Sequence, residues 1–196
     1  SLIENMKIAE REGVCVEPLP LERGRIGGDR LRSLIRPETA LVAMEAVCGE
    51  TGTIWNTREV ADILRKNAPQ AYLLVDASQA PFTERVTREH FGADLLVFDG
   101  AKVGVPGIGV VSVHRTVPMV PLYGGGGQER GLRPGTQAPS LAEDFAHALS
   151  RVERHSVTFH LRAERTPSAA HRRTRARYPR NNPLACQRGS RTCPLY

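Results

Sequence analysis

Strand-length apolar runs alternate with amphipathic stretches along most of the chain. The aliphatic runs are continuous, as expected for strands buried on both faces of a sheet, and they lie at residues 39–47, 71–75, 93–98 and 108–113. The stretches with apolar side chains at helical spacing lie at residues 1–12, 29–35, 57–66, 84–90 and 139–154. Strands that alternate with helices predict an α/β protein with a mainly parallel sheet flanked by helices.

Two smaller features complete the predicted elements. Val14, Cys15 and Val16 form a short strand candidate, which precedes a loop rich in proline and glycine. Asp29 and Thr57 are the expected N-caps of the second and third helices, because each precedes the apolar positions of its helix.

Polar side chains follow two of the buried runs directly. Asp76 comes after the run at 71–75 and opens the segment Asp-Ala-Ser-Gln-Ala, and the residues from Asp99 to Lys102 follow the next run. In α/β sheets, ligands bind outside the carboxyl ends of the strands. We therefore expect the polar residues of both segments to lie where this sheet binds a ligand.

Composition narrows the class of protein. Hydrophobic residues make up 40% of the chain, enough for a core, and the longest aliphatic runs are far shorter than the roughly 20 residues of a membrane-spanning helix. The first residues lack the pattern of a signal peptide. The shortness of the aliphatic runs predicts no membrane partner. The cysteines form no CxxC pair, which predicts reduced thiols in a cytoplasmic protein with no metal centre. They are Cys15, Cys48, Cys186 and Cys193.

The net charge of +6 is concentrated near the C-terminus. From Arg151 onward, Glu153 and Glu164 are the only acidic residues. Residues 158–196 are predicted to be a disordered tail, because they bury too little surface to offset their ordering entropy; an out-of-frame translation would also explain them. The tail lacks interleaved aromatic residues and a recognisable binding module, so nucleic acid is not an expected partner.

Lys102 is the residue with the most specific chemistry. The chain has three lysines against many arginines, and this lysine lies in a glycine-rich turn just past a buried run. A lysine amine can lose its proton and bond to a carbonyl carbon, whereas a guanidinium stays charged. Taken alone, the residue would more simply be a solvated loop lysine.

Three motifs in a fixed order favour the chemical interpretation. The segment at 76–80 and the turn at 99–102, with Pro106 after it, are followed by residues 124–136, which read GGGGQERGLRPGT. Over about residues 1–157 the chain resembles the middle of a class V, fold-type I aminotransferase, specifically the cysteine desulfurases and selenocysteine lyases. The resemblance implies that residues 1–157 are part of the large domain of a pyridoxal-phosphate-dependent transferase.

The resemblance implies roles for four residues. Lys102 would hold pyridoxal 5'-phosphate covalently and later move protons at the substrate α-carbon. Asp76 would pair with the pyridine nitrogen, which keeps the ring an electron sink, and Gln79 would hydrogen-bond the cofactor's phenolic oxygen. Thr136 would reach the phosphate of the neighbouring subunit, so a homodimer is the expected assembly.

The implied reaction takes sulfur from L-cysteine and leaves L-alanine. A sulfur-acceptor protein is a further expected partner. Selenocysteine lyases and other class V enzymes remain alternatives, because this region does not separate them. A degenerate, non-catalytic relative that keeps the fold for binding or dimerisation is another alternative.

Departures from the family pattern favour that non-catalytic alternative. Asp99 and Ala101 stand where the family has a phosphate-binding serine and a histidine, and Cys48 stands where it has an asparagine that contacts the ring. The turn from Lys102 to Gly109 is one residue shorter than usual. The family's N-terminal phosphate-binding segment, its stacking histidine and its loop cysteine are expected to lie outside the match. We therefore expect no turnover by these 196 residues alone.

Overall fold

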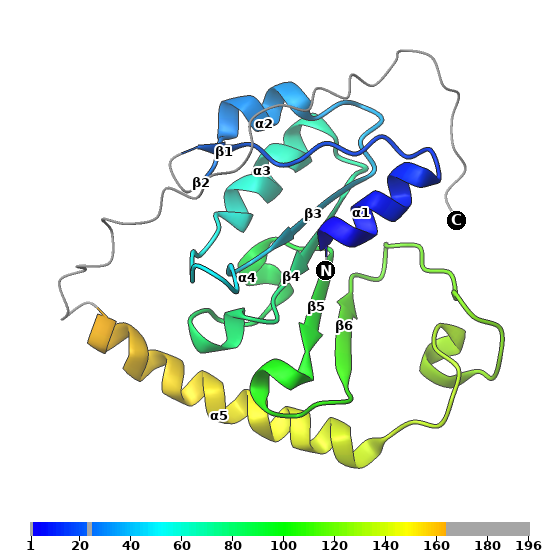
Figure 1. The fold of residues 1–196 in the computed structure, drawn as a ribbon, viewed down its shortest axis with the longest axis vertical. Coiled ribbons are helices and arrows are strands. Elements are labelled where there is room, and N and C mark those ends of the chain that lie inside the picture. Colours follow the sequence, from blue (N-terminus) through cyan, green and yellow to red (C-terminus); the bar gives the residue numbers. More distant parts are fainter. Residues whose placement is uncertain (1, 23–24, 164–196) are drawn as a thin grey trace.

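A four-stranded sheet lies at the centre of the computed structural model, which describes residues 2–22 and 25–163, with side chains as far as residue 152. The strands, in spatial order, are β3 (Leu41–Glu45), β4 (Tyr72–Asp76), β5 (Leu95–Asp99) and β6 (Gly109–Val113). β3, β4 and β5 run parallel, and β6 runs antiparallel to β5 (Figure 1). The prediction of an α/β fold with a mainly parallel sheet flanked by helices is confirmed.

Helices connect the parallel strands, as the alternating pattern requires. The helices are α1 (Leu2–Arg11), α2 (Gly28–Leu34), α3 (Thr57–Asn67), α4 (Arg88–Phe91) and α5 (Pro139–Ala163), and the short 3-10 turns are η1 (Ala80–Phe82), η2 (Gly100–Val103) and η3 (Gln128–Gly131). β1 (Leu21–Glu22) and β2 (Arg25–Ile26) form a separate antiparallel pair before α2.

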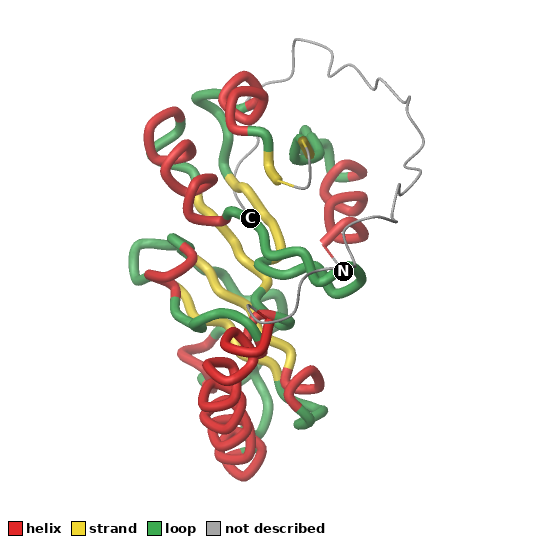
Figure 2. The backbone as a smooth tube through the Cα atoms, turned by 90° about the vertical axis from the view of Figure 1, so that its left-hand side faces the viewer, coloured by secondary structure: helices red, strands yellow, loops and turns green. Residues whose placement is uncertain are grey.

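The hydrophobic core lies on one face of the sheet. Leu73 and Val75 of β4 are fully buried there, together with Val60 and Leu64 of α3 and Phe145 of α5. Figure 2 shows α1, which begins near the N mark, on the opposite side of the strands from most other helices. α1 has no buried residue, so the sheet is packed mainly from the side of α3 and α5.

Alternation along the strands separates the two faces. Val42 and Met44 of β3 are buried, whereas Leu41 of the same strand is 51% exposed. On β6, the outward residue Val111 is 54% exposed. The second face is therefore exposed at its edge strands and half-buried along β4, and at its carboxyl edge Asp76 is half-buried and Asp99 is exposed.

Several predicted boundaries were wrong for local reasons. Val14–Val16 is not a strand: the Val14 amide donates to Ala9 O (3.0 Å) and completes the end of α1. The helix predicted at 84–90 is shortened to α4, because the extended residue Thr87 caps it by accepting from His90 N (3.1 Å).

The predicted helix caps also moved by one or two residues. Gly27, and not Asp29, is the N-cap of α2, and Asp29 lies in the first turn, where it pairs with Arg32. Asn56, and not Thr57, is the N-cap of α3; its side chain is bonded to the backbone of Ile26 instead of capping the helix. Tertiary contacts thus override the local capping preference.

The C-terminal helix extends beyond its predicted end, to Ala163. The predicted tail lies outside the described residues from residue 164 onward, as do Cys186 and Cys193. Among the described residues, neither Cys15 nor Cys48 forms a disulfide. None of the helices in this part of the chain is both long enough and apolar enough to cross a membrane.

Candidate functional site

The carboxyl ends of β3, β4 and β5 meet at one edge of the sheet and carry acidic side chains. Glu45 is paired in register with Asp76, which is paired in turn with Val97, and Asp99 follows two residues later on the same face. A cavity of about 440 Å³ opens at this edge, and these residues line it together with Lys102. The volume lies within the range of about 300–1,000 Å³ for small-molecule sites.

The turn that carries Lys102 is built by short-range hydrogen bonds. β5 ends at Asp99, whose carboxylate accepts a bond from Ala101 N (2.9 Å) and so caps the 3-10 turn η2. Gly104 ends the turn with a φ of +86°, a conformation that favours glycine. Lys102 lies between these two fixed points, exposed and on the cavity wall.

The segment after β4 supplies the opposite wall. The carboxylate of Asp76 accepts a bond from Ser78 N (3.0 Å), and the hydroxyl of Ser78 accepts one from Asp99 N (3.0 Å). The amide of Gln79 lies against Gly49, where a Cβ atom would be 3.2 Å from Gln79 Nε2. Asp76, Ser78 and Gln79 are all half-buried.

The structure brings together three of the four site residues that the sequence indicated. Asp76, Gln79 and Lys102 line the same cavity. Thr136 is exposed in the segment between η3 and α5 and does not line this cavity. Cys48 is half-buried, and its backbone closes a turn, with Cys48 N donating to Thr53 O (2.8 Å).

Sequence reasoning missed two polar residues of the cavity, Glu45 and Ser78. Glu45 ends β3 directly opposite Asp76, and its carboxylate accepts a bond from Trp55 Nε1 (3.3 Å). Ser78 lies inside the segment that drew attention to Asp76, but nothing in the sequence alone showed that it bonds to the next strand. The register of the strands was the missing information in both cases.

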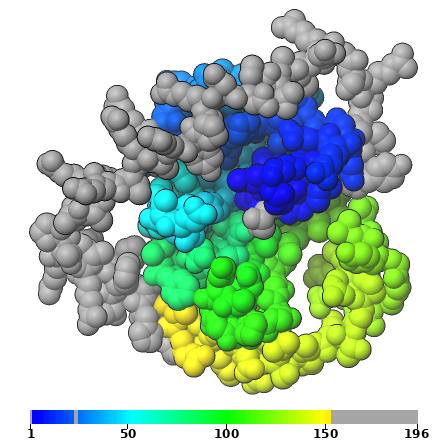
Figure 3. Space-filling view, viewed as in Figure 1, coloured from blue at the N-terminus to red at the C-terminus, as the bar shows by residue number. Residues whose placement is uncertain are grey.

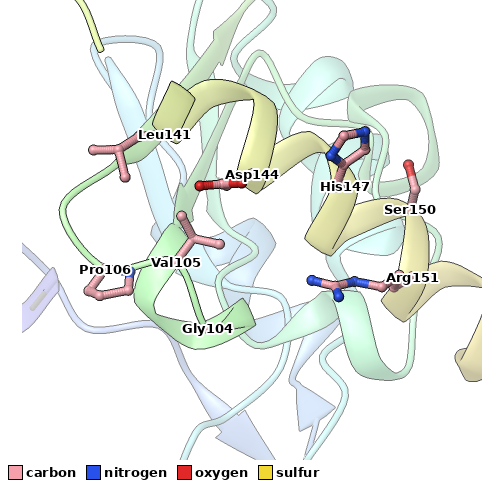
Figure 4. A pocket seen from close by; sticks show the side chains of 8 residues that line it. All are labelled: Gly104, Val105, Pro106, Leu141, Asp144, His147, Ser150 and Arg151. Carbon is pink, nitrogen blue, oxygen red and sulfur yellow. The ribbon is translucent and has the colours of Figure 1, made fainter. Parts of the chain in front are cut away.

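A larger cavity, of about 770 Å³, lies behind the lysine turn (Figure 4). Gly104, Val105 and Pro106 form one wall, and α5 contributes polar side chains that include Asp144 and His147. None of its lining residues is a lysine or lies at a strand end. The smaller cavity is the candidate site, because there an amine, an amide and carboxylates converge at the sheet edge where α/β folds bind ligands. Within the described part of the chain, no group of histidine, cysteine and acidic residues could hold a metal ion.

The fold and this cavity define an α/β protein with an exposed lysine at the carboxyl edge of its sheet. The sequence model of the family described as aminotransferase class-V matches residues 2–144. The chain belongs to the class-V aminotransferase family.

Named relatives are similar over most of the chain. The mitochondrial cysteine desulfurase of Saccharomyces cerevisiae is 38% identical over 157 residues, which cover 78% of this chain and 31% of that protein. The cysteine desulfurase IscS 1 of Archaeoglobus fulgidus is 32% identical, over 76% of this chain and 38% of that protein. The chain therefore spans about a third of the length of the curated relatives that it matches.

Solved structures show the same relationship. A NifS-like protein superposes with a TM-score of 0.77 at 31% identity, covering 83% of this chain and 46% of that one. DndA from Streptomyces lividans gives a TM-score of 0.72 at 32% identity, over 83% and 47%. SspA, solved in complex with cysteine, gives 0.68 at 28% identity, over 76% and 43%.

The comparisons correct one prediction. The cytoplasmic location expected from the cysteines is contradicted, because the relatives from Saccharomyces cerevisiae, Candida maltosa and Dictyostelium discoideum are mitochondrial or probable mitochondrial proteins. Free thiols persist in any reducing environment. Cysteine usage therefore could not distinguish one such compartment from another.

Proposed function

We propose that this chain carries the cofactor-holding part of a cysteine desulfurase that uses pyridoxal 5'-phosphate to take sulfur from L-cysteine and leave L-alanine. The observation that carries the proposal is the convergence of Lys102, Asp76 and Gln79 on one cavity at the carboxyl edge of the sheet. The similarity to cysteine desulfurases from a yeast and an archaeon supports the substrate class.

The lining residues fit the ring end of this cofactor. The bound group would supply an electron sink for a negative charge at the substrate α-carbon. Asp76 presents a half-buried carboxylate that can hold a proton on a pyridine nitrogen. One oxygen of this carboxylate accepts a hydrogen bond from Ser78 N, which fixes the orientation of the carboxylate. Gln79 offers an amide donor to a ring oxygen, and the amine of Lys102 can bond to a carbonyl carbon and move a proton.

The phosphate end fits less well. Asp99 is exposed on the cavity wall, and Glu45 adds a second carboxylate next to Asp76. Among the residues that line the cavity, Lys102 is the sole cation, and the proposal uses its amine for the ring. A phosphate dianion would therefore meet like charge here, which favours weak binding.

This misfit favours a second candidate function, that of a family relative that keeps the fold without turnover. The carboxylate of Asp99 is locked in place by its bond to Ala101 N (2.9 Å), so it cannot simply turn away without uncapping η2. In this case the cavity would bind amines or aldehydes that contain a ring, without completing the reaction on L-cysteine.

Assembly as a homodimer with a second copy of the chain is part of the proposal. The segment between β6 and α5 arches away from the body (Figure 3). It exposes large apolar side chains, with Leu122 at 85%, Tyr123 at 67% and Val120 at 59%. Such side chains are typical of interfaces, and Thr136 lies farther along the same segment. Sedimentation should show a dimer that Leu122→Asp weakens; a wild-type monomer would contradict this part.

Absorbance spectroscopy tests the cofactor proposal directly. Pyridoxal 5'-phosphate added to the purified chain should produce a visible band, and borohydride reduction should fix the cofactor mass to the peptide that contains Lys102. Lys102→Arg keeps the positive charge but removes the reactive amine, so it should abolish both signals. Lys66→Arg is the matched control, because Lys66 is on α3 and outside the cavity.

Two further results separate the candidates. Release of alanine from L-cysteine would support the desulfurase, whereas a band dependent on Lys102 without any alanine would favour the non-catalytic relative. A wild-type chain that shows neither band nor trapped mass would contradict both.

A further inference from the structure

Ser78 connects the two strand ends that form the candidate site. It lies two residues after Asp76 and is half-buried on the cavity wall. Its backbone N–H donates to Asp76 Oδ1 (3.0 Å), and its hydroxyl oxygen accepts a bond from Asp99 N (3.0 Å). One residue therefore contacts both the carboxylate at the end of β4 and the backbone at the end of β5.

The side chain of Ser78 hydrogen-bonds β5 beyond the last backbone bond between β4 and β5. The parallel pairing of β4 with β5 ends at Asp76 opposite Val97, with one further bond from Ala77 N to Val97 O (2.9 Å). Beyond that bond β4 turns away into η1, and its backbone no longer reaches β5. The hydroxyl of Ser78 holds Asp99 N instead.

The same set of bonds continues into the lysine turn. Asp99 Oδ1 accepts a bond from Ala101 N (2.9 Å), the residue before Lys102. Three consecutive hydrogen bonds of 2.9–3.0 Å thus join four residues, in the order Asp76, Ser78, Asp99 and Ala101. Displacement of Ser78 would move the lysine turn relative to Asp76.

We propose that Ser78 is a positioning residue that sets where the amine of Lys102 stands relative to the carboxylate of Asp76. This inference rests on the proposed function, in which both groups contact one cofactor ring. A rigid ring can meet both groups only when their separation is right, and small misplacements of reacting groups cost large factors. Loss of the hydroxyl should weaken cofactor affinity about tenfold, because one hydrogen bond between uncharged groups contributes about that much.

Three variants isolate the hydroxyl. Ser78→Ala removes it, and Ser78→Thr keeps it. Thr39→Val is the matched control, because the half-buried Thr39 also accepts a backbone bond, from Arg36 N (2.9 Å), but it precedes β3 at the opposite end of the sheet. A loss of general stability would affect Ser78→Ala and Thr39→Val alike.

Two measurements on the full chain test the inference. Without cofactor, amide hydrogen exchange followed by NMR should show about tenfold faster exchange at Asp99 in Ser78→Ala and wild-type exchange in the other two variants. With pyridoxal 5'-phosphate, the visible band should require about tenfold more cofactor in Ser78→Ala, and Ser78→Thr should restore wild-type affinity.

The outcomes are distinguishable from those of the proposed function. If the wild type gives no band dependent on Lys102, the proposed function fails, and exchange at Asp99 still decides whether Ser78 ties the two strand ends. Unchanged amide exchange at Asp99 in Ser78→Ala would show that the Ser78 hydroxyl does not connect the ends of β4 and β5. Faster exchange with unchanged cofactor affinity, or equal losses in Ser78→Ala and Thr39→Val, overturns the positioning role.

Discussion

Replacement of Gly100 by alanine should break the turn that carries Lys102. A Cβ atom at this position would lie 2.5 Å from Val105 O and 2.7 Å from Ile108 O, well inside the ordinary contact distance of 3.4 Å. The Ile108 carbonyl is held by the bond from Gly100 N (2.9 Å), and the backbone of Val105 is held by its own N–H, which donates to Gly100 O (2.8 Å). Relief of either contact therefore requires movement of the backbone.

The magnitude follows from the two backbone contacts. Overpacking of a well-packed site costs about 1–3 kcal/mol, and simultaneous contact with two backbone carbonyls of the same turn places Gly100→Ala near the upper limit. A loss of about 3 kcal/mol lowers the equilibrium constant for folding roughly a hundredfold. Because η2 carries Lys102, the visible band with pyridoxal 5'-phosphate should also weaken.

Urea unfolding measures this cost, with the single tryptophan, Trp55, as the fluorescent reporter. The matched control is Gly124→Ala, because a Cβ at Gly124 meets nothing within 4 Å; its stability should stay within about 0.5 kcal/mol of the wild type. A Gly100→Ala chain with the wild-type midpoint and an unchanged band would refute the reasoning, since it would mean that the turn relaxes at no cost.

Three other changes test separate parts of the structure. Asp94→Ala should lower the free energy of unfolding by about 2 kcal/mol in urea, because the carboxylate pairs with Arg65 through both oxygens at 2.9 Å and is 16% exposed; a loss below about 0.5 kcal/mol would contradict this. The hydrogen bond from Asn56 lowers the pKa of Glu59 below 4.5, so its contribution to stability is present above that pH and is lost as the pH falls through the lowered value. Glu59→Gln should therefore reduce the loss of unfolding free energy at acid pH by less than about 1 kcal/mol. An unaltered dependence of the unfolding free energy on pH would argue against the lowered pKa of Glu59. Asp99→Ser should raise the affinity for pyridoxal 5'-phosphate about tenfold in the absorbance titration by removing like charge, and equal or weaker binding would exclude repulsion as the cause of the misfit.

The sheet was predictable because its strands have the simplest signal. Residues 71–75 and 93–98 are continuous apolar runs, and each became a strand, β4 and β5, within one or two residues. Such runs have no polar face to orient, so length and flanking residues suffice to identify them. The antiparallel direction of β6 was not predicted, because a strand's apolar pattern does not state its direction.

The cap of α3 depended on a contact between distant residues. The Asn56 side chain bonds to Ile26, 30 residues away, and this contact is not visible in a local capping pattern. At Val14 the competing bond is local: its amide is used at the end of α1 and is not available to a strand. A local capping pattern competes with tertiary hydrogen bonds, and at Asn56 the tertiary bonds win.

The sequence indicated three residues that line the candidate site, Asp76, Gln79 and Lys102, but not the residues that hold them in place. Lys102 was a candidate because a lysine amine can lose its proton and bond to a carbonyl carbon, and the ordered motifs around it favoured that use over a solvated loop lysine. Ser78 and Glu45 have ordinary residue types, and their place in the site depends on strand register, which brings Glu45 beside Asp76. Supporting residues are therefore found only once the strands are aligned.

The charged side chains of the cavity bear on cofactor binding, whereas family membership rests on the sequence match. Family membership follows from the match over residues 2–144, and it holds whatever the chain can do. The described cavity offers one amine against the carboxylates of Glu45, Asp76 and Asp99. A protonated ring and its substrate amine are cationic and suit such a wall, whereas a phosphate dianion does not. Full-strength binding of the cofactor would thus require cationic or N–H ligands for the phosphate from outside these lining residues.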